Sequence, residues 1–391
     1  MRRLLKGNSK VIYLTVLIYI IYSLQGVLYS SGSFISQMLM LLYIVIGVTH
    51  FVMTFLKIKY NLPILMALLF VLLNIFYYVF NGEVANDLAY QQTKGVLACF
   101  TPFIVAFYYT YKGEFNEAIF TPLSVILFGV YLLSFNRLND ILMEDIGVSE
   151  AIVNNVSYSF TRIIPLLFYS NSNILIALAF LLLINFFIIL GAKRGAAVSA
   201  VISDMGYFIY LLKNPHKSSI INKLIILFLV IAFMFGVFYV LDSNNFLMER
   251  FLEGDLSDRD SIYRDIWNWW TSPDTKPINF LFGGGIASSA NITGGSLAHN
   301  DWLEVVSNFG LLGGIVYGVL LISITVNVLS TKIYRDKISG IVVVVMWWVT
   351  SFSSTWYNTL DNFPVMLLLG YLMGRNYTQC QGKNALASFI N

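Results

Sequence analysis

The stretch SDRDSIYRDIWNWW, residues 257–270, is the most informative part of this chain, together with LFGGGI at 281–286 and GGSLAHNDWLEVVSNFGLLGG at 294–314. These strings lie in or directly after a polar island, residues 242–300, which interrupts an otherwise apolar sequence. The island concentrates arginines, a run of glycines and a single histidine between two apolar segments. This layout predicts a membrane-embedded chain in which one large loop carries the polar chemistry.

The composition indicates a polytopic membrane protein. Of the 391 residues, 58% are hydrophobic and only 12% are charged, whereas an average soluble domain carries about 25% charged residues. The two cysteines, Cys99 and Cys380, are too few for the disulfide framework of a small secreted protein. We therefore expect an all-α integral membrane protein with a single membrane domain over residues 1–391.

Apolar segments that approach the length of a membrane span recur along the chain. A span needs roughly 20 mostly apolar residues, and eleven segments meet or approach this length. They are 11–29, 34–56, 62–80, 95–111, 117–135, 174–191, 195–212, 223–241, 302–329, 340–356 and 362–374. Residues 158–170, interrupted by Pro165, form a weaker twelfth candidate. No small-residue cleavage site follows the first segment, so we expect it to be retained as a span.

Basic residues predict the orientation of these spans, because lysine and arginine collect in cytoplasmic loops. They cluster at the N-terminus, at 57–59, at 332–337 and at 375–383. About 12 transmembrane helices, with both termini cytoplasmic, place all of these clusters inside, whereas eleven do not. The island 242–300, the loop 136–157 and the turn at Lys193 and Arg194 are then expected on the outer face.

The first part of the island predicts a short surface helix. A capping pattern that begins at Ser257 indicates a helix over about 258–271, which ends before Pro273. Its apolar residues share one face with Arg259, so we expect this helix to lie on the membrane surface. Arg264 points about 140° away from Arg259 at 100° per residue. The two arginines are therefore not expected to bind the same group.

The second part of the island predicts a tight turn followed by another helix. Glycines at 283–285 permit a sharp turn or a close backbone approach to a ligand. The next helix is expected to begin near His299 and to continue through Gly310 and Gly314, whose small size suits close packing. His299 is one of only three histidines in the chain, and the other two are expected on the opposite face. A histidine-based metal site is therefore excluded.

These strings resemble the signature region of the O-antigen ligase and polymerase superfamily. The usual pattern there is close to SGR, then PLFGVG, then HN ahead of an apolar helix that ends in GLLG. This chain has SDR at 257–259, LFGGGI at 281–286 and HN ahead of GLLGG. Arg194 in GAKRGA is similar to the family's SRG arginine, with Lys193 where serine is more usual. The resemblance covers about residues 190–320.

The resemblance implies a metal-independent glycosyltransferase of the GT-C type, which needs no cofactor and uses undecaprenyl-diphosphate-linked glycans. Arg194 and Arg259 are assigned to the diphosphate, because a guanidinium is permanently charged and binds phosphate through paired hydrogen bonds. His299 is the candidate general base, because neutral imidazole accepts a proton near neutral pH. Substrate-binding roles are assigned to Arg264, Asn300, Gly284 and Arg162.

Each assignment has a structural alternative. Arg194 and Arg162 are alternatively interfacial anchors that reach lipid headgroups. Arg259 and Arg264 alternatively form solvated pairs with nearby acids on a helix surface. His299 is alternatively a residue that only starts a helix.

Three functional classes remain open at the outer face of a bacterial cytoplasmic membrane. A polymerase joins lipid-linked repeat units, a ligase transfers the finished glycan to lipid A-core or a protein, and a flippase moves the lipid-linked oligosaccharide. The halves of the chain do not repeat each other, which disfavours a flippase. An Ile, Phe, Tyr and Asn bias resembling polysaccharide polymerases favours the polymerase. Its expected partners are membrane lipids and a chain-length regulator, and no nucleic acid is expected.

Overall fold

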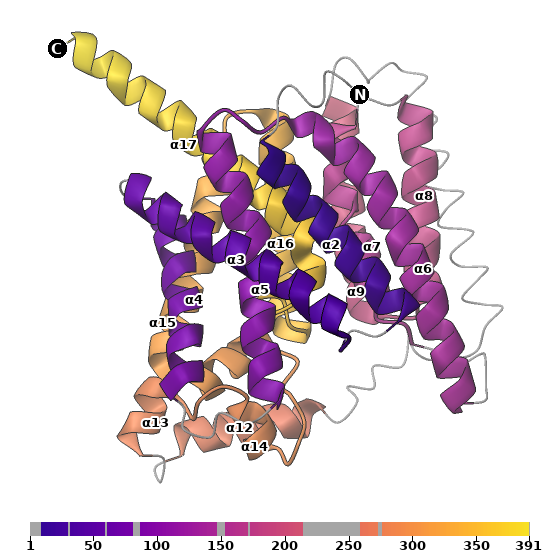
Figure 1. Cartoon of the computed structure of the whole chain (residues 1–391), viewed down its shortest axis with the longest axis vertical. Coiled ribbons are helices and arrows are strands. Elements are labelled where there is room, and N and C mark those ends of the chain that lie inside the picture. The colour runs from indigo at the N-terminus through magenta and orange to yellow at the C-terminus, as the bar shows by residue number, and fades with distance from the viewer. Residues whose placement is uncertain are drawn as a thin grey trace.

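The computed structural model is all-helical over the residues that it describes (Figure 1). These residues are 9–29, 32–58, 61–80, 87–146, 153–170, 173–213, 259–272 and 276–390. The long helices are α2 (Lys10–Leu28), α3 (Phe34–Lys57), α4 (Leu62–Phe80), α5 (Asp87–Tyr111), α6 (Phe120–Ile146), α8 (Ile174–Leu190), α9 (Arg194–Lys213), α15 (Asp301–Leu329), α16 (Tyr334–Ser353) and α17 (Phe363–Ile390). The shorter elements are η1 (Glu117–Ile119), α7 (Ser157–Thr161), η3 (Ile164–Tyr169), α12 (Arg259–Thr271), α13 (Pro277–Phe282), α14 (Ser288–Ile292) and η4 (Leu360–Asn362).

Seven of the described helices are long and apolar enough to cross a membrane. They are α2, α3, α4, the η1–α6 unit, α9, α15 and α16, and each overlaps a span expected from the sequence. Helix α8 is apolar but shorter, at 17 residues. The span expected at 223–241 lies outside the described residues. The helices thus agree with the prediction of an all-α membrane protein.

Helices α5 and α17 form the centre of the bundle. Residues 98–110 and 362–374 are buried without exception. The two helices touch at Gly370 and Gly374. The contact is so close that a Cβ added at Gly370 would collide with the carbonyl oxygen of Phe103. Small residues at a helix contact allow this close approach, which is the usual way in which helices pack in lipid.

The outer helices turn large apolar side chains away from the bundle. Leu17, Phe55, Leu72 and Ile322 are examples from α2, α3, α4 and α15, and each is between 48% and 60% exposed. Extended apolar surface of this kind is unfavourable in water and marks a face that something apolar covers. The exposed apolar faces of these helices therefore fit insertion into a membrane.

The two ends of the bundle differ in composition. Helices α12, α13 and α14 cover one end, and the last turns of α17 leave at the other (Figure 1). At this second end, Glu117 Oε2 lies 2.6 Å from Arg335 Nη2 and 3.1 Å from Arg375 Nη1. Lys57 lies at the same end, where its Nζ donates to the Tyr108 hydroxyl at 3.1 Å. The basic residues Lys57, Arg335 and Arg375, which the charge pattern assigns to one side of the membrane, therefore lie at one end of the bundle, opposite α12, α13 and α14.

The weak span expected at 158–170 is not a continuous helix. Helices α7 and η3 there have only five and six residues. The segment nevertheless runs along the first half of α6, since Asn154 Nδ2 donates to the Phe135 carbonyl at 3.0 Å and the Thr121 hydroxyl donates to the Tyr169 carbonyl at 3.3 Å. Irregular backbone at this depth is tolerated because protein, rather than lipid, surrounds it.

Helices and expected spans end at different residues. Helix α6 continues to Ile146, through much of the expected outer loop 136–157, and α17 continues to Ile390, beyond the expected span 362–374. Hydropathy shows where lipid contact ends, whereas the helix continues as long as the following residues favour helical backbone.

Candidate active site

His299 lies in the loop between α14 and α15, in a left-handed backbone conformation. Its φ is 48°, which non-glycine residues rarely adopt. The fully buried Glu304 holds this loop: Oε1 accepts the Ala298 N–H at 2.6 Å, and the backbone of His299 donates to the same carboxylate. Glu304 Oε2 accepts the Ser289 hydroxyl at 2.8 Å. These bonds fix the backbone at His299, and the residue itself is exposed.

Asn300 fixes the start of α15 next to His299. Its Oδ1 accepts the Leu303 N–H at 3.1 Å, as an N-cap residue does. Its Nδ2 donates to the Phe352 carbonyl at 3.0 Å, and the residue is only 7% exposed. Both ends of the amide are used within the protein, so Asn300 is a positioning residue in this structure.

Arg259 is the first residue of α12, in agreement with the helix predicted at about 258–271; Ser257, the expected capping residue, lies outside the described residues. The Nη1 of Arg259 donates to the carbonyl of Ser353, at the C-terminal end of α16, at 2.8 Å. A carbonyl at this end of a helix is partly negative and attracts a cation. Because a guanidinium has five N–H donors, one such contact leaves donors for a ligand.

Lys193 and Arg194 lie at the tight turn between α8 and α9. Ala192 in this turn has a φ of 50°. Gly191 packs so closely on α7 that a Cβ would collide with a serine hydroxyl there. Arg194 begins α9, and both basic side chains are partly buried. The turn is thus fixed against α7 and brings its basic residues to the same end as His299.

The positive charges of two other segments act on His299. Desolvation by the surrounding protein lowers its pKa most, and Arg259 and Lys193 lower the pKa further. Positive neighbours disfavour the imidazolium, so neutral imidazole, the form that accepts a proton, is favoured at neutral pH. Lys193 was not assigned a role from the sequence, because the family pattern drew attention to Arg194. The signal for Lys193 was the adjacent pair of basic residues on an expected outer turn.

The glycine turn approaches another part of the same backbone. The N–H groups of Gly284 and Gly285 donate to the carbonyls of Ser307 and Asn308 at 2.7 and 3.0 Å. Helix α15 breaks beside this contact, where Gly310 has φ 62° and ψ −157°. The prediction of an unbroken helix through Gly310 is therefore wrong. The two carbonyls just before the break accept hydrogen bonds from the glycine turn.

Asp301, a second buried carboxylate, joins the start of α15 to the chain after α16. Its Oδ1 accepts the Trp356 N–H at 2.8 Å, and its Oδ2 accepts the Tyr317 hydroxyl. Asp301 is fully buried, as Glu304 is. Neither acid was singled out in the sequence. The available signal was the presence of two acids in the first turn of an apolar helix, where carboxylates favour backbone N–H groups.

Arg162 is buried beside the site and does not reach solvent as a headgroup anchor would. Its side chain is 4% exposed, and Nη1 lies 3.5 Å from Asp361 Oδ2. The Ser159 hydroxyl donates to the same oxygen at 2.8 Å. Tyr158 lies within electrostatic range of both Arg162 and Arg259. Arg162 is therefore held by Asp361 next to the site and is not among the charges that act on His299.

Arg264 does not join this group. It is exposed on α12, and among the described residues no hydrogen bond or ion pair connects it to another candidate. Its offset of about 140° from Arg259 around the helix agrees with this separation.

Unusual backbone conformations mark the same end of the molecule. In the described part of the chain, the non-glycine residues with positive φ are Ala192, Ala287 and His299. Ala192 precedes Lys193, Ala287 directly precedes α14, and His299 carries the imidazole. Backbone strain of this kind persists where the surrounding structure enforces it, and it clusters at functional sites.

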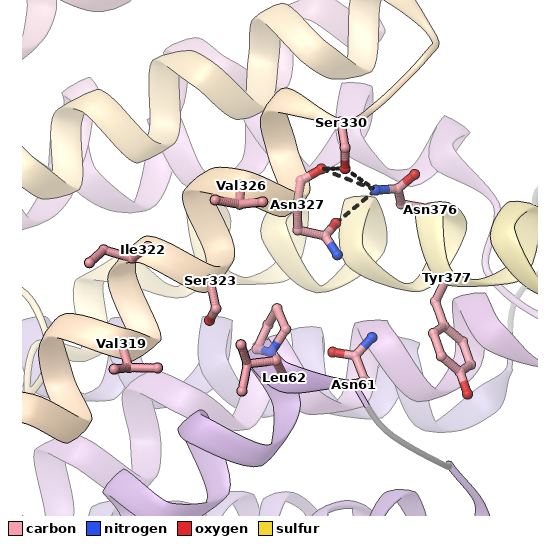
Figure 2. Close-up of a pocket in the computed structure, with 11 residues that line it drawn as sticks. Asn61, Leu62, Val319, Ile322, Ser323, Val326, Asn327, Ser330, Asn376 and Tyr377 are labelled. Carbon is pink, nitrogen blue, oxygen red and sulfur yellow. Dashed lines mark hydrogen bonds between the residues drawn. The ribbon is translucent and has the colours of Figure 1, made fainter.

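A pocket of about 440 Å³ lies at the other end, between α4, α15 and α17 (Figure 2). Asn376 closes one side, where its Nδ2 donates to the Asn327 carbonyl at 3.0 Å and to Asn327 Oδ1 at 2.9 Å (Figure 2). Ile322 and Val326 give it an apolar wall. It contains none of the candidate residues, so the candidate active site is the end that carries His299.

The structure thus brings His299, Arg259 and Lys193 together from three separate segments, with Arg194 and Arg162 nearby. No family model matches the chain, and no curated protein matches it. The site is defined by its own arrangement: one exposed imidazole whose pKa is lowered by desolvation and by two cations, and a polar framework that fixes the backbone at His299 and the guanidinium of Arg259.

Proposed function

We propose that the protein is a membrane glycosyltransferase that acts on diphosphate-linked glycans. The observation that carries this proposal is the convergence of Lys193 and Arg259 on His299 at one end of a bundle of apolar helices. A base beside two cations at a membrane boundary suits a substrate whose leaving group is anionic and attached to lipid. The strings that resemble the O-antigen ligase and polymerase superfamily support the same class of reaction.

In the proposed reaction, the hydroxyl oxygen of an acceptor sugar attacks the anomeric carbon of the donor glycan. The bond from this carbon to the diphosphate oxygen breaks, and its electron pair leaves with undecaprenyl diphosphate. His299 takes the proton of the attacking hydroxyl. Arg259, Lys193 and Arg194 neutralise the charge that develops on the diphosphate.

We assign the chain to the bacterial cytoplasmic membrane, with twelve spans, both termini in the cytoplasm and the island 242–300 in the periplasm. The grouping of Lys57, Arg335 and Arg375 at the end away from His299 supports this orientation, because cytoplasmic loops are enriched in basic residues.

Within this class we propose a polymerase that joins repeat units, assisted by a chain-length regulator. A ligase would share the donor chemistry of His299 and Arg259 and differ in its acceptor. A flippase breaks no covalent bond and activates no hydroxyl, so a neutral imidazole placed beside two cations favours group transfer over transport.

The variant His299→Ala tests the proposal. Loss of a general base slows catalysis by roughly 10²- to 10⁴-fold, so we expect polymer to disappear while the protein remains in the membrane. Ser296→Ala, at an exposed position in the same loop, is the matched control and should retain polymer. Long glycan made by the histidine variant would refute the assignment of the base.

Glycan gels of the null strain separate the two enzymes. Loss of a polymerase leaves single repeat units on lipid A-core. Loss of a ligase leaves bare core and strands the polymer on its lipid carrier. Bare core in the null strain would therefore show that the protein is a ligase and not a polymerase.

A further inference from the structure

A pocket of about 650 Å³ opens at the same end as His299, between α12, α13, α14 and the end of α4. Three aromatic rings, two amides and one serine hydroxyl contribute to its lining: Tyr77, Trp269, Phe282, Asn279, Asn291 and Ser288. The reaction proposed above makes no use of these side chains.

The walls of this pocket are fixed by contacts within the protein. Trp269 packs on the glycine turn, since a Cβ at Gly284 would lie 3.1 Å from Cη2 of the indole. Tyr77 donates its hydroxyl to the Phe282 carbonyl, which attaches the end of α4 to the same turn. Ser288 is buried, and its N–H donates to a side-chain oxygen of α15 at 3.1 Å. The pocket is therefore largely formed before a ligand enters, which is usual for binding sites.

The chemistry of the lining selects among ligands. No residue that lines the pocket is charged, so a phosphate or an acidic sugar would find no counter-ion there. A lipid chain would fit the apolar part of the lining, Ile278, Phe282 and Ile292, but would make no hydrogen bond to the amides of Asn279 and Asn291. An uncharged sugar ring matches both parts of the lining, because its C–H face packs on an indole and its hydroxyls bind amides.

We propose that this pocket binds an uncharged sugar unit of the glycan. The inference rests on the proposed function and adds to it a site at a distance from the diphosphate. Arg259 and Trp269 are ten residues apart on α12, which is about 15 Å along the helix axis. The sugar held beside Trp269 is therefore not the one that reacts at His299 but a unit further along the chain.

Binding of free glycans tests the proposal independently of catalysis. The full-length protein in lipid nanodiscs is applied to an array of defined neutral and acidic bacterial oligosaccharides, and binding is titrated by fluorescence. We expect binding to at least one neutral oligosaccharide, and Trp269→Ala should weaken it about tenfold or more, the loss that corresponds to one good aromatic contact. Asn291→Ala, at an exposed position on α14, should also weaken binding without disturbing the fold.

Trp267→Ala is the matched control. Trp267 lies on the same helix, is 53% exposed and does not line the pocket, so this variant should bind as the unmodified protein does. His299→Ala should also retain binding, which separates the two proposals. Glycosyl transfer without Trp269-dependent binding would overturn the sugar site and leave the proposed function intact.

Three other outcomes would overturn the sugar site. One is binding to acidic oligosaccharides alone, and another is the absence of binding to every oligosaccharide on the array. The third is a lipid that native mass spectrometry finds on the purified protein and that Trp269→Ala removes.

Discussion

Arg259 and Asn300 bind adjacent carbonyl groups at the end of α16. Arg259 Nη1 lies 2.8 Å from the carbonyl oxygen of Ser353, and Asn300 Nδ2 lies 3.0 Å from that of Phe352. Asn300 directly follows His299, so the end of one helix fixes both the cation and the imidazole. The spacing of two groups that are 40 residues apart in the chain therefore depends on a third segment.

Replacing Asn300 should loosen this arrangement. Asn300→Ala removes the N-cap, a loss of about 1 kcal/mol, and the bond to Phe352, roughly another 1 kcal/mol. Asn300→Asp keeps the capping oxygen and loses only the donor to Phe352, so it should be the milder variant. Thermal unfolding in detergent measures both. An Asn300→Asp variant as stable as the unmodified protein would contradict the importance of the second bond.

Lys193 should control the pH dependence of transfer. Lys193 lowers the pKa of His299, so removing its charge in Lys193→Met should raise this pKa. Because the base is active only when neutral, the acid limb of the rate profile should then move to higher pH. Lys213→Met, at the other end of α9, is the control. An acid limb that stays in place would show that Lys193 does not act on the base.

Glu304 should position His299 through the backbone. Glutamine has one acceptor oxygen where the carboxylate has two, so Glu304→Gln leaves an N–H or hydroxyl without its partner, at a cost of about 1–3 kcal/mol. We expect kcat to fall while the KM for the donor stays near its original value. Ser289→Ala loses only the Oε2 partner and keeps the Ala298 bond. A fall in kcat of the same size in this control would argue against positioning.

Gly310 and Gly314 make a matched pair for stability. A Cβ at Gly310 would lie 2.5 Å from three backbone atoms of residues 281–283, on a residue with φ of 62°, whereas at Gly314 the nearest atom is 3.4 Å away. Gly310→Ala should therefore cost more than about 2 kcal/mol, and Gly314→Ala less than about 1 kcal/mol. Differential scanning fluorimetry distinguishes them. Similar unfolding temperatures for the two variants would mean that the break in α15 is dispensable.

The elements that depend on local pattern were predictable from the sequence. Hydropathy placed both ends of five of the seven apolar span helices within one residue, and capping residues predicted the helix at 258–271. The continuation of α6 to Ile146 was not predictable in this way, because hydropathy does not report helix that extends past the lipid.

The parts of the site that depend on distant contacts were harder to predict. The sequence singled out His299 and Arg259, but the role of Lys193 required the α8–α9 turn to fold back toward α15. The break at Gly310 depends on N–H groups that lie 25 residues earlier in the chain. No local pattern contains that information, since glycine in an apolar helix usually indicates close packing.

The break at Gly310 also separates two mechanical parts of α15. Residues 301–309 are bonded to the glycine turn and to the end of α16, whereas residues 311–329 lie among the apolar helices. When a bilayer becomes thinner or thicker, apolar helices adjust by tilting. Because the break divides α15, we expect such tilting to change the angle at Gly310 more than the geometry around His299.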